Sequence, residues 1–166
     1  RPDSPVIITA TGPDAAEVID SVQLIAWVAS NRGESRRALE LMQTYLPHAR
    51  IATRDDDLLL ASYLGRLASC HLACGEKEAA AEYMRETIAA HDRDGQAPKP
   101  ALATTLAALA VLQAEVGDDD EAMRLAERCL ALPKDLLPDG HWVRGEALLA
   151  TGQVKVHRAF ATAMRA

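Results

Sequence analysis

The sequence predicts an all-α fold built from antiparallel helix pairs, and three observations lead to that expectation. Hydrophobic residues make up 49% of the 166 residues and aromatic residues only 4%, so the apolar content is mostly Ala and Leu, which are the strongest helix formers. No stretch alternates cleanly between apolar and polar residues, which argues against a sheet. Gly33, Gly75 and Gly117 recur at intervals of 42 residues, and such a period indicates a repeat architecture.

Each of these three glycines stands in the same sequence context. A glycine just past a helix end allows the left-handed turn conformation, and an acid after it favours the N-terminus of the next helix. Small residues on both sides of the turn let two helices pack closely. The matching sets are Glu34, Glu76 and Asp118 after the glycines, Ala38, Ala80 and Ala122 beyond them, and Ala26, Ala68 and Ala110 before them. We therefore expect each glycine to join the two helices of one pair.

Larger apolar residues accompany the alanines that precede each turn. Ile25, Leu67 and Leu109 stand one place before Ala26, Ala68 and Ala110. Because these positions recur with the repeat, we expect all three side chains to be buried in the seam between helices.

The first pair follows a segment with a different composition. Residues 1–13 contain three prolines, and we expect them to form an extended lead-in. The first helix is predicted from about residue 14 to residue 30. The second is predicted from residue 34 to about residue 46, because Pro47 disfavours a helical residue before it.

The second and third pairs have their own start and stop signals. The acidic run 55–57 is expected to cap a helix that ends near Ala73, and its partner is expected over 77–91. A loop is expected from residue 94 to 100, because this segment contains Gly95, Pro98 and Pro100. The third pair is then predicted as helices over residues 101–115 and 119–132, the latter stopped by Pro133.

The last part of the chain matches the repeat poorly. Gly152 lies 35 residues after Gly117, Gly145 holds the small position before it, and His157 replaces the alanine of the second helix. We interpret this part as a degenerate terminal pair, since terminal repeats are often atypical. The predicted divisions are residues 14–54, 55–100, 101–138 and 139–166.

These segments together resemble the tetratricopeptide repeat. The matching residues are Leu24-Ile25-Ala26 with Gly33-Glu34 and Ala38, Leu67-Ala68 with Gly75-Glu76 and Ala80, and Leu109-Ala110 with Gly117-Asp118 and Ala122. The resemblance covers about residues 16–133 and implies a right-handed α-solenoid. The family's common repeat has about 34 residues, so the longer repeat here is similar to those of kinesin light chains and of bacterial signalling proteins.

The resemblance also implies where a partner would bind. In tetratricopeptide proteins the first helices of the pairs line a concave groove that holds a peptide or a partner helix. The positions implied here are Asp20, Gln23, Trp27, Asn31, Ser62, Arg66, Ser69, Ala73, Thr104, Val111 and Glu115. Two interpretations of Trp27 have equal weight. In the first, its aromatic side chain anchors a ligand; in the second, it packs against the lead-in. No Lys and Asn clamp for a C-terminal carboxylate is evident, so no chaperone-tail specificity is implied.

Metal and catalytic alternatives are weaker. Cys70 and Cys74 share a helix face but His71 points away from it, so two buried thiols are favoured over a zinc site. The runs 55–57 and 118–121 lack the alternating pattern of a calcium loop and are better explained as helix caps. The five histidines are scattered and no glycine-rich phosphate loop is present. We therefore expect neither a cofactor nor an enzyme activity.

The net charge and the cysteine content limit which classes of partner and which cellular compartment fit this sequence. A net charge of −6 disfavours binding to nucleic acid or to an anionic membrane surface. Three cysteines, an odd number, suggest free thiols in a reducing, cytoplasmic compartment. No apolar run is long enough to span a membrane. The first residue is Arg1 rather than Met, so we expect a piece of a longer protein. The resemblance implies that this protein is a larger bacterial signalling or regulatory protein.

The leading functional hypothesis is a protein-interaction scaffold. The alternative is a homodimer formed through the terminal pair, where Val154, Val156, Phe160 and Met164 give a modest apolar stripe. An enzyme or a metal-binding domain is the third hypothesis and would require a deep polar cavity with converging titratable groups.

Overall fold

The computed structural model describes residues 14–165, so the predicted lead-in over residues 1–13 lies outside the described residues. The described part contains seven α-helices and no strand. Their bounds are α1 (Asp14–Asn31), α2 (Ser35–Ala52), α3 (Asp57–Ala73), α4 (Lys77–Asp94), α5 (Pro100–Val116), α6 (Asp119–Leu130) and α7 (Trp142–Ala163).

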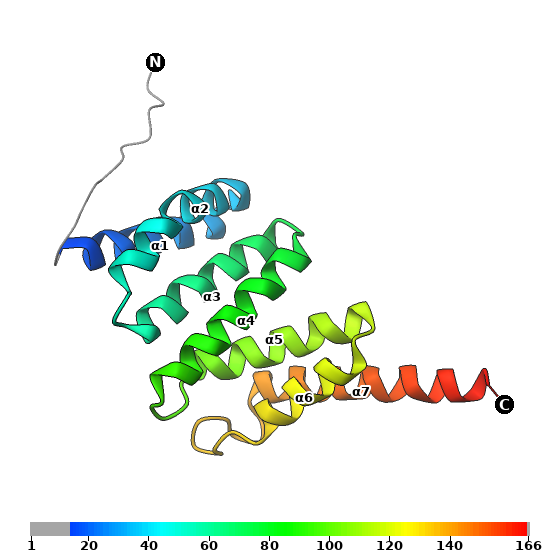
Figure 1. Cartoon of the computed structure of the whole chain (residues 1–166). Helices are drawn as coiled ribbons and strands as arrows, with labels where there is room; N and C mark the ends of the chain where they lie inside the picture. The colour runs from blue at the N-terminus through cyan, green and yellow to red at the C-terminus, as the bar shows by residue number, and fades with distance from the viewer. Residues whose placement is uncertain (1–13, 166) are drawn as a thin grey trace.

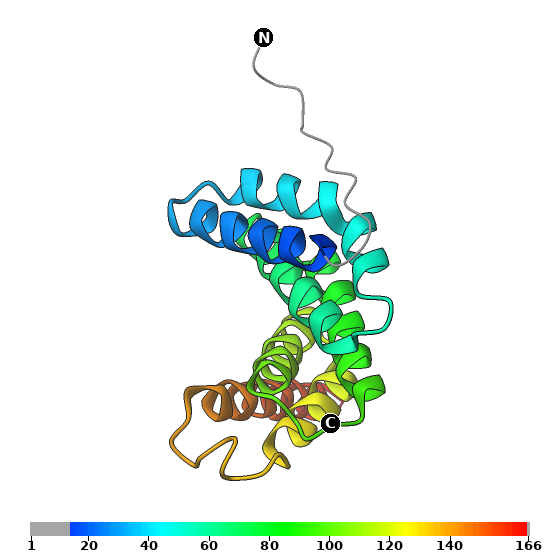
Figure 2. The same ribbon diagram turned by 90° about the vertical axis from the view of Figure 1, so that its left-hand side faces the viewer.

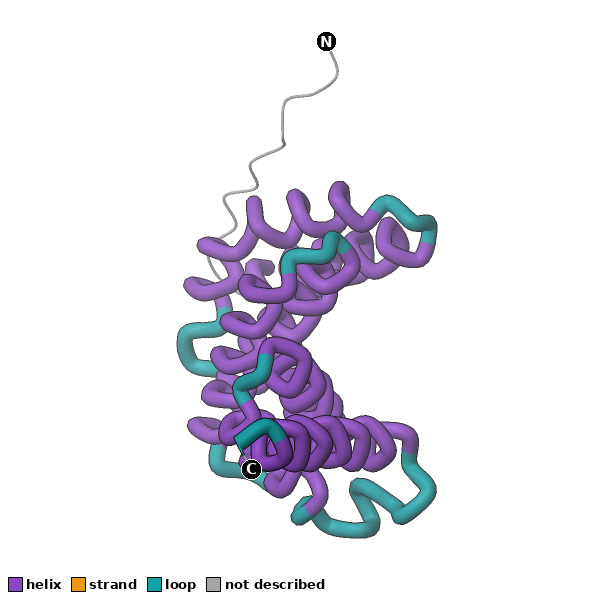
Figure 3. The backbone as a smooth tube through the Cα atoms, turned by 90° about the vertical axis from the view of Figure 1, so that its right-hand side faces the viewer, coloured by secondary structure: helices purple, strands orange, loops and turns teal. Residues whose placement is uncertain are grey.

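The helices stack as antiparallel pairs in a right-handed α-solenoid (Figure 1). α1 packs on α2, α3 on α4 and α5 on α6, and each pair also packs on the first helix of the next pair. The stack curves into an arc that opens to the left in Figure 2 and to the right in Figure 3. The predicted all-α fold and solenoid architecture are confirmed.

The turns within the three pairs have the same geometry. Gly33, Gly75 and Gly117 have φ angles of 80°, 79° and 84°, a left-handed conformation that side chains rarely adopt. The acid after each glycine donates its backbone N–H to a carbonyl in the last turn of the preceding helix. These bonds are Glu34 N to Ala29 O, Glu76 N to His71 O and Asp118 N to Gln113 O, each 2.9 Å long. The predicted role of the glycines is confirmed.

The expectation for the seam residues is confirmed at two positions and wrong at the first. Leu67 and Leu109 are fully buried, whereas Ile25 is 55% exposed. Leu67 packs into the cluster formed by α1 and α2, so this position faces the preceding helix pair. No preceding pair exists within residues 14–165 to cover Ile25.

The predicted end of α2 near Pro47 is wrong, because the helix continues to Ala52. Proline lacks the N–H of a helical hydrogen bond and normally destabilises a helix interior. The residues beyond it make tertiary contacts that offset this effect. Ala49 is fully buried, and the Arg50 guanidinium pairs with Glu86 of α4 at 2.6 Å. At the end of the helix, buried Thr53 adds a local hydrogen bond from its hydroxyl to Ala49 O at 2.8 Å.

The predicted terminal pair is also wrong, since the described part of this segment contains one helix, α7. Gly152, the expected turn residue, lies inside α7 and has no positive φ angle. Val154 beyond it is fully buried, so packing continues through the expected turn. α7 contacts both α5 and α6, just as α5 contacts both α3 and α4. It is therefore the first helix of a fourth repeat.

Candidate functional site

Two adjoining cavities lie along the first helices of the pairs. The first, here called the α1–α3 cavity, has a volume of about 320 Å³. The second, the α3–α5 cavity, has a volume of about 500 Å³. Ser62 and Arg66 of α3 line both cavities, so the two form one continuous surface.

The α1–α3 cavity is lined by one face of α1 and by two residues of α3. Gln23 is buried, and its Oε1 accepts a hydrogen bond from the Ser62 hydroxyl at 3.2 Å. This contact joins the two helices across the floor of the cavity. Trp27 remains 52% exposed and offers an aromatic surface there. Asp20 supplies the carboxylate of this cavity.

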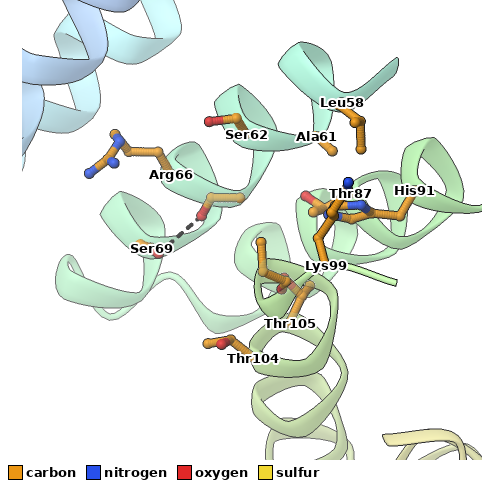
Figure 4. Close-up of a pocket in the computed structure, with 12 residues that line it drawn as sticks. Leu58, Ala61, Ser62, Arg66, Ser69, Thr87, His91, Lys99, Thr104 and Thr105 are labelled. Atoms are coloured by element: carbon orange, nitrogen blue, oxygen red, sulfur yellow. Dashed lines mark hydrogen bonds between the residues drawn. The ribbon is translucent and has the colours of Figure 1, made fainter. Parts of the chain in front are cut away.

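The α3–α5 cavity receives residues from three helices and one loop (Figure 4). α3 contributes one wall, the end of α4 contributes Thr87 and His91, and Lys99 precedes α5. The complete lining is Leu58, Ala61, Ser62, Gly65, Arg66, Ser69, Thr87, His91, Lys99, Ala101, Thr104 and Thr105. This lining contains two cations and one histidine but no carboxylate.

The hydroxyl groups of the α3–α5 cavity already donate hydrogen bonds. Ser69 donates to Gly65 O at 3.0 Å, as Figure 4 shows. Thr87, Thr104 and Thr105 donate to backbone carbonyls one turn earlier in their own helices, at 2.8, 3.2 and 2.8 Å. Their oxygens still accept hydrogen bonds, but the available donors of the cavity are nitrogen atoms.

Two side chains of this cavity each have a nitrogen atom that lacks a hydrogen-bond partner among the described residues. The Nε atom of Arg66 and the Nε2 atom of His91 are buried without a hydrogen bond. Burial lowers the pKa of His91, which favours its neutral form at neutral pH. The charge of the cavity therefore comes from Arg66 and Lys99.

Seven of the eleven residues that the resemblance implies line these cavities. They are Asp20, Gln23, Trp27, Ser62, Arg66, Ser69 and Thr104.

The other four predicted positions lie elsewhere. Asn31 donates its side-chain amide to Trp27 O at 2.9 Å at the end of α1. Glu115 pairs with Lys77 at 2.6 Å, and partly buried Val111 packs against the core. Ala73 is exposed at the end of α3. These residues occupy the turn ends of their helices, beyond the cavities.

Sequence reasoning missed the contributions of α4 and of the loop before α5. His91 belongs to a second helix, and the resemblance directs attention to first helices only. Lys99 follows the predicted loop signals Gly95 and Pro98, and loops between rigid elements often carry binding residues. The position of Lys99 in a predicted loop was therefore the sequence signal that could have identified it as a cavity residue.

The suspected metal residues are engaged in packing and hydrogen bonds. Cys70 is buried, and burial raises the pKa of its thiol. His71 stacks on Tyr83 with a centroid separation of 5.2 Å, and its Nδ1 lies 2.7 Å from Glu76 Oε2. Among residues 14–165 no group of three or more His, Cys, Asp or Glu side chains is placed to hold a metal ion.

The acidic runs cap helices, as the sequence predicts. The Asp56 carboxylate accepts a hydrogen bond from Leu59 N at 2.9 Å at the start of α3. Asp118 accepts one from Glu121 N at 3.1 Å at the start of α6. None of the described helices combines the length and the apolar character needed to cross a membrane.

The comparisons with known proteins agree with this geometry. Residues 105–138, which cover most of α5 and all of α6, match the family model described as tetratricopeptide repeat. A crystal structure from Podosopora anserina, described as a putative kinesin light chain with nearly identical TPR-like repeats, is similar to this chain with a TM-score of 0.70 and 20% sequence identity. The similarity covers 87% of this chain and 71% of that chain, and concerns the fold. No curated protein sequence matches this chain.

Proposed function

We propose that this chain, an α-solenoid whose residues 105–138 match the tetratricopeptide repeat model, is a protein-interaction scaffold. Its ligand is an extended peptide or a partner helix that lies along α1, α3 and α5. The observation that carries the proposal is the pair of adjoining cavities on these helices, which share Ser62 and Arg66. A partially exposed Trp27 at one end adds an aromatic contact of the kind that dominates many interfaces.

The proposed setting is a larger bacterial signalling or regulatory protein in the cytoplasm. The repeat length of 42 residues supports this setting by resemblance. All three cysteines are free, which is typical of proteins from reducing compartments. The net charge of −6 supports a protein partner over nucleic acid. The proposal includes no catalytic role and no cofactor.

A peptide library tests the groove directly. Ser69 is exposed within the α3–α5 cavity, so Ser69→Tyr should fill that space and abolish capture of peptides that the unaltered chain selects. Ala89 is an exposed residue of α4 that lines neither cavity, and Ala89→Tyr is the matched control. Equal capture by both variants would refute groove binding.

Self-association through α7 is the second candidate, and a specific observation favours it. The outer face of α7 exposes Trp142, Leu149, Val156 and Phe160, with fractions of 60%, 55%, 63% and 71%. Exposed apolar patches of this kind often mark protein contacts. A cavity of about 640 Å³ lies on the same face, between Gly145 and His157.

Light scattering over a concentration series distinguishes the two candidates. A dimer that becomes monomeric in Val156→Glu, and that persists in Trp27→Ala, would support contact through α7. A monomer at all concentrations would remove self-association and leave groove binding as the proposed function.

A further inference from the structure

We propose that the α3–α5 cavity binds an acidic side chain of the partner peptide, with Arg66 and Lys99 as its specificity-determining residues. This inference rests on the proposed function, since it names the chemistry of the ligand in the same groove. The relevant feature is a local positive charge in a chain whose net charge is −6.

Most basic side chains of the described part are neutralised by carboxylates. Arg36, Arg50, Lys77, Arg85, Arg93 and Arg128 each pair with an acid of another helix or turn. Arg66 and Lys99 form no such pair in residues 14–165, although both line a cavity. An unpaired cation in a groove attracts an anionic ligand, because a ligand carboxylate supplies the missing counter-charge.

The immediate surroundings strengthen this charge. The lining of the α3–α5 cavity contains no Asp or Glu, so no carboxylate inside this cavity competes with a ligand for either cation, and Asp20 lines only the adjoining α1–α3 cavity. Partial burial around Arg66 increases the strength of an ion pair relative to open solvent. The Arg66 guanidinium also presents planar donors that match a carboxylate in a bidentate geometry.

The positions of the two cations suggest an extended ligand. Figure 4 shows Arg66 and Lys99 on opposite sides of the cavity, with Arg66 extending toward α1. Arg66 also lines the α1–α3 cavity, where Asp20 supplies a negative charge. A peptide that crosses both cavities would therefore place its acidic residue in the α3–α5 cavity, whose lining has no carboxylate, and not in the α1–α3 cavity, which Asp20 lines.

The geometry also explains why an anion is favoured over a neutral ligand. The hydroxyls of Ser69, Thr104 and Thr105 already donate to backbone carbonyls. A neutral amide or alcohol would gain few new hydrogen bonds from them. A carboxylate gains charge-assisted bonds from the free nitrogen donors, which are about twice as strong as neutral ones.

The experiment measures fluorescence anisotropy of a labelled peptide of alternating Glu and Gly at low salt. A peptide of alternating Gln and Gly and a phosphoserine peptide are the comparison probes. The Glu peptide should bind, and Arg66→Gln and Lys99→Gln should each weaken binding about tenfold, which corresponds to loss of one charge-assisted contact. Binding should weaken as salt rises, because salt screens the charges.

Matched variants separate a specific site from general charge. Arg54 and Lys155 are exposed cations outside both cavities with no ion pair in the described part, so Arg54→Gln and Lys155→Gln should leave the affinity unchanged. Arg66→Lys should retain part of the binding. Thermal unfolding of Arg66→Gln should match the unaltered chain, since Arg66 has no intramolecular ion pair to lose.

The outcomes distinguish this inference from the proposed function. Equal binding of the Glu and Gln peptides, or equal losses in Arg54→Gln and Arg66→Gln, would overturn the acidic specificity while peptide capture by the groove still stands. A strong preference for the phosphoserine peptide would overturn the assignment to a carboxylate. Selection of library peptides that depend on Ser69 but carry no Asp or Glu would also reject this inference alone.

Discussion

Arg50 and Glu86 join the first two helix pairs through an ion pair of 2.6 Å between Nη2 and Oε2. Asp92 and Arg128 form the corresponding contact between the second and third pairs. Both pairs span 36 residues, and Arg50 and Asp92, like Glu86 and Arg128, lie 42 residues apart. The same position of the repeat therefore holds an ion pair twice, with the charges exchanged. α4 carries both acids and is flanked by an arginine on either side.

The exchange of charges between the two sites predicts that Arg50 and Glu86 can exchange their charges with little net change in stability. Glu86→Arg should lower the free energy of unfolding by about 1 kcal/mol, because it replaces an attraction by a repulsion between half-exposed groups. The double exchange Arg50→Glu with Glu86→Arg should recover most of the loss. Urea unfolding measures both values, and a double variant no more stable than Glu86→Arg would contradict the prediction.

The hydroxyl of Tyr63 predicts a stability effect in the core. Tyr63 is fully buried and donates to Met42 O at 2.6 Å, which joins α3 to α2. Tyr63→Phe keeps the ring but removes the donor, and should lower the free energy of unfolding by about 1–1.5 kcal/mol. Tyr83→Phe is the control, because no hydrogen bond of its hydroxyl is present in residues 14–165, and should change the free energy little in a urea titration.

Two glycines should respond to alanine in opposite directions. Gly117 has a φ angle of 84°, so Gly117→Ala should destabilise the chain by about 1–2 kcal/mol. Gly152 lies inside α7 with open space around its Cα, so Gly152→Ala should stabilise it by about 0.5–1 kcal/mol. Chemical unfolding followed by circular dichroism checks both signs. Loss of stability in Gly152→Ala would show that the helical interpretation of this residue is wrong.

The contacts of Glu76 predict a pH-dependent contribution to stability. Hydrogen bonds from Arg36 and then His71 lower the pKa of Glu76 below its usual value of 4.5. A lowered folded-state pKa gives a stabilisation that is complete above the unfolded-state pKa and is lost as the pH falls through the folded-state pKa. Glu76→Gln should therefore lower Tm at pH 7, and the difference from the unaltered chain should shrink below about pH 4.

Thermal scans between pH 3 and pH 8 measure this difference. Glu127 is exposed and has no ion pair in the described part of the chain, so Glu127→Gln should leave Tm nearly unchanged across the range. A Tm difference for Glu76→Gln that is constant with pH would indicate that the contact acts through neutral hydrogen bonding alone.

The repeated turns were predictable because their causes are local. Gly33, Gly75 and Gly117 each need a left-handed backbone, and the acid after each glycine repeats with them. The continuation of α2 through Pro47 was not predictable in the same way. It depends on Ala49 and Arg50 contacting residues of other helices, and no local pattern reports such contacts.

The groove was partly predictable for the same reason. Family resemblance identified Trp27 and Arg66 because first helices have a regular orientation in such repeats. Lys99 and His91 reach the α3–α5 cavity from a loop and from the end of α4. Their participation follows from how far α4 extends and from the path to α5, which are tertiary properties.

The position of α3 between two hydrophobic clusters has a mechanical consequence. Leu67 packs with α1 and α2, whereas its neighbour Ala68 packs with α4 to α6. In a helical-repeat stack each unit contacts only its neighbours. Helix α3 contributes residues to the hydrophobic packing of both halves of this stack. Because Ser62 and Arg66 of this helix line both cavities, a small bend there would change the width of both at once. A ligand that spans both cavities would then oppose such a bend.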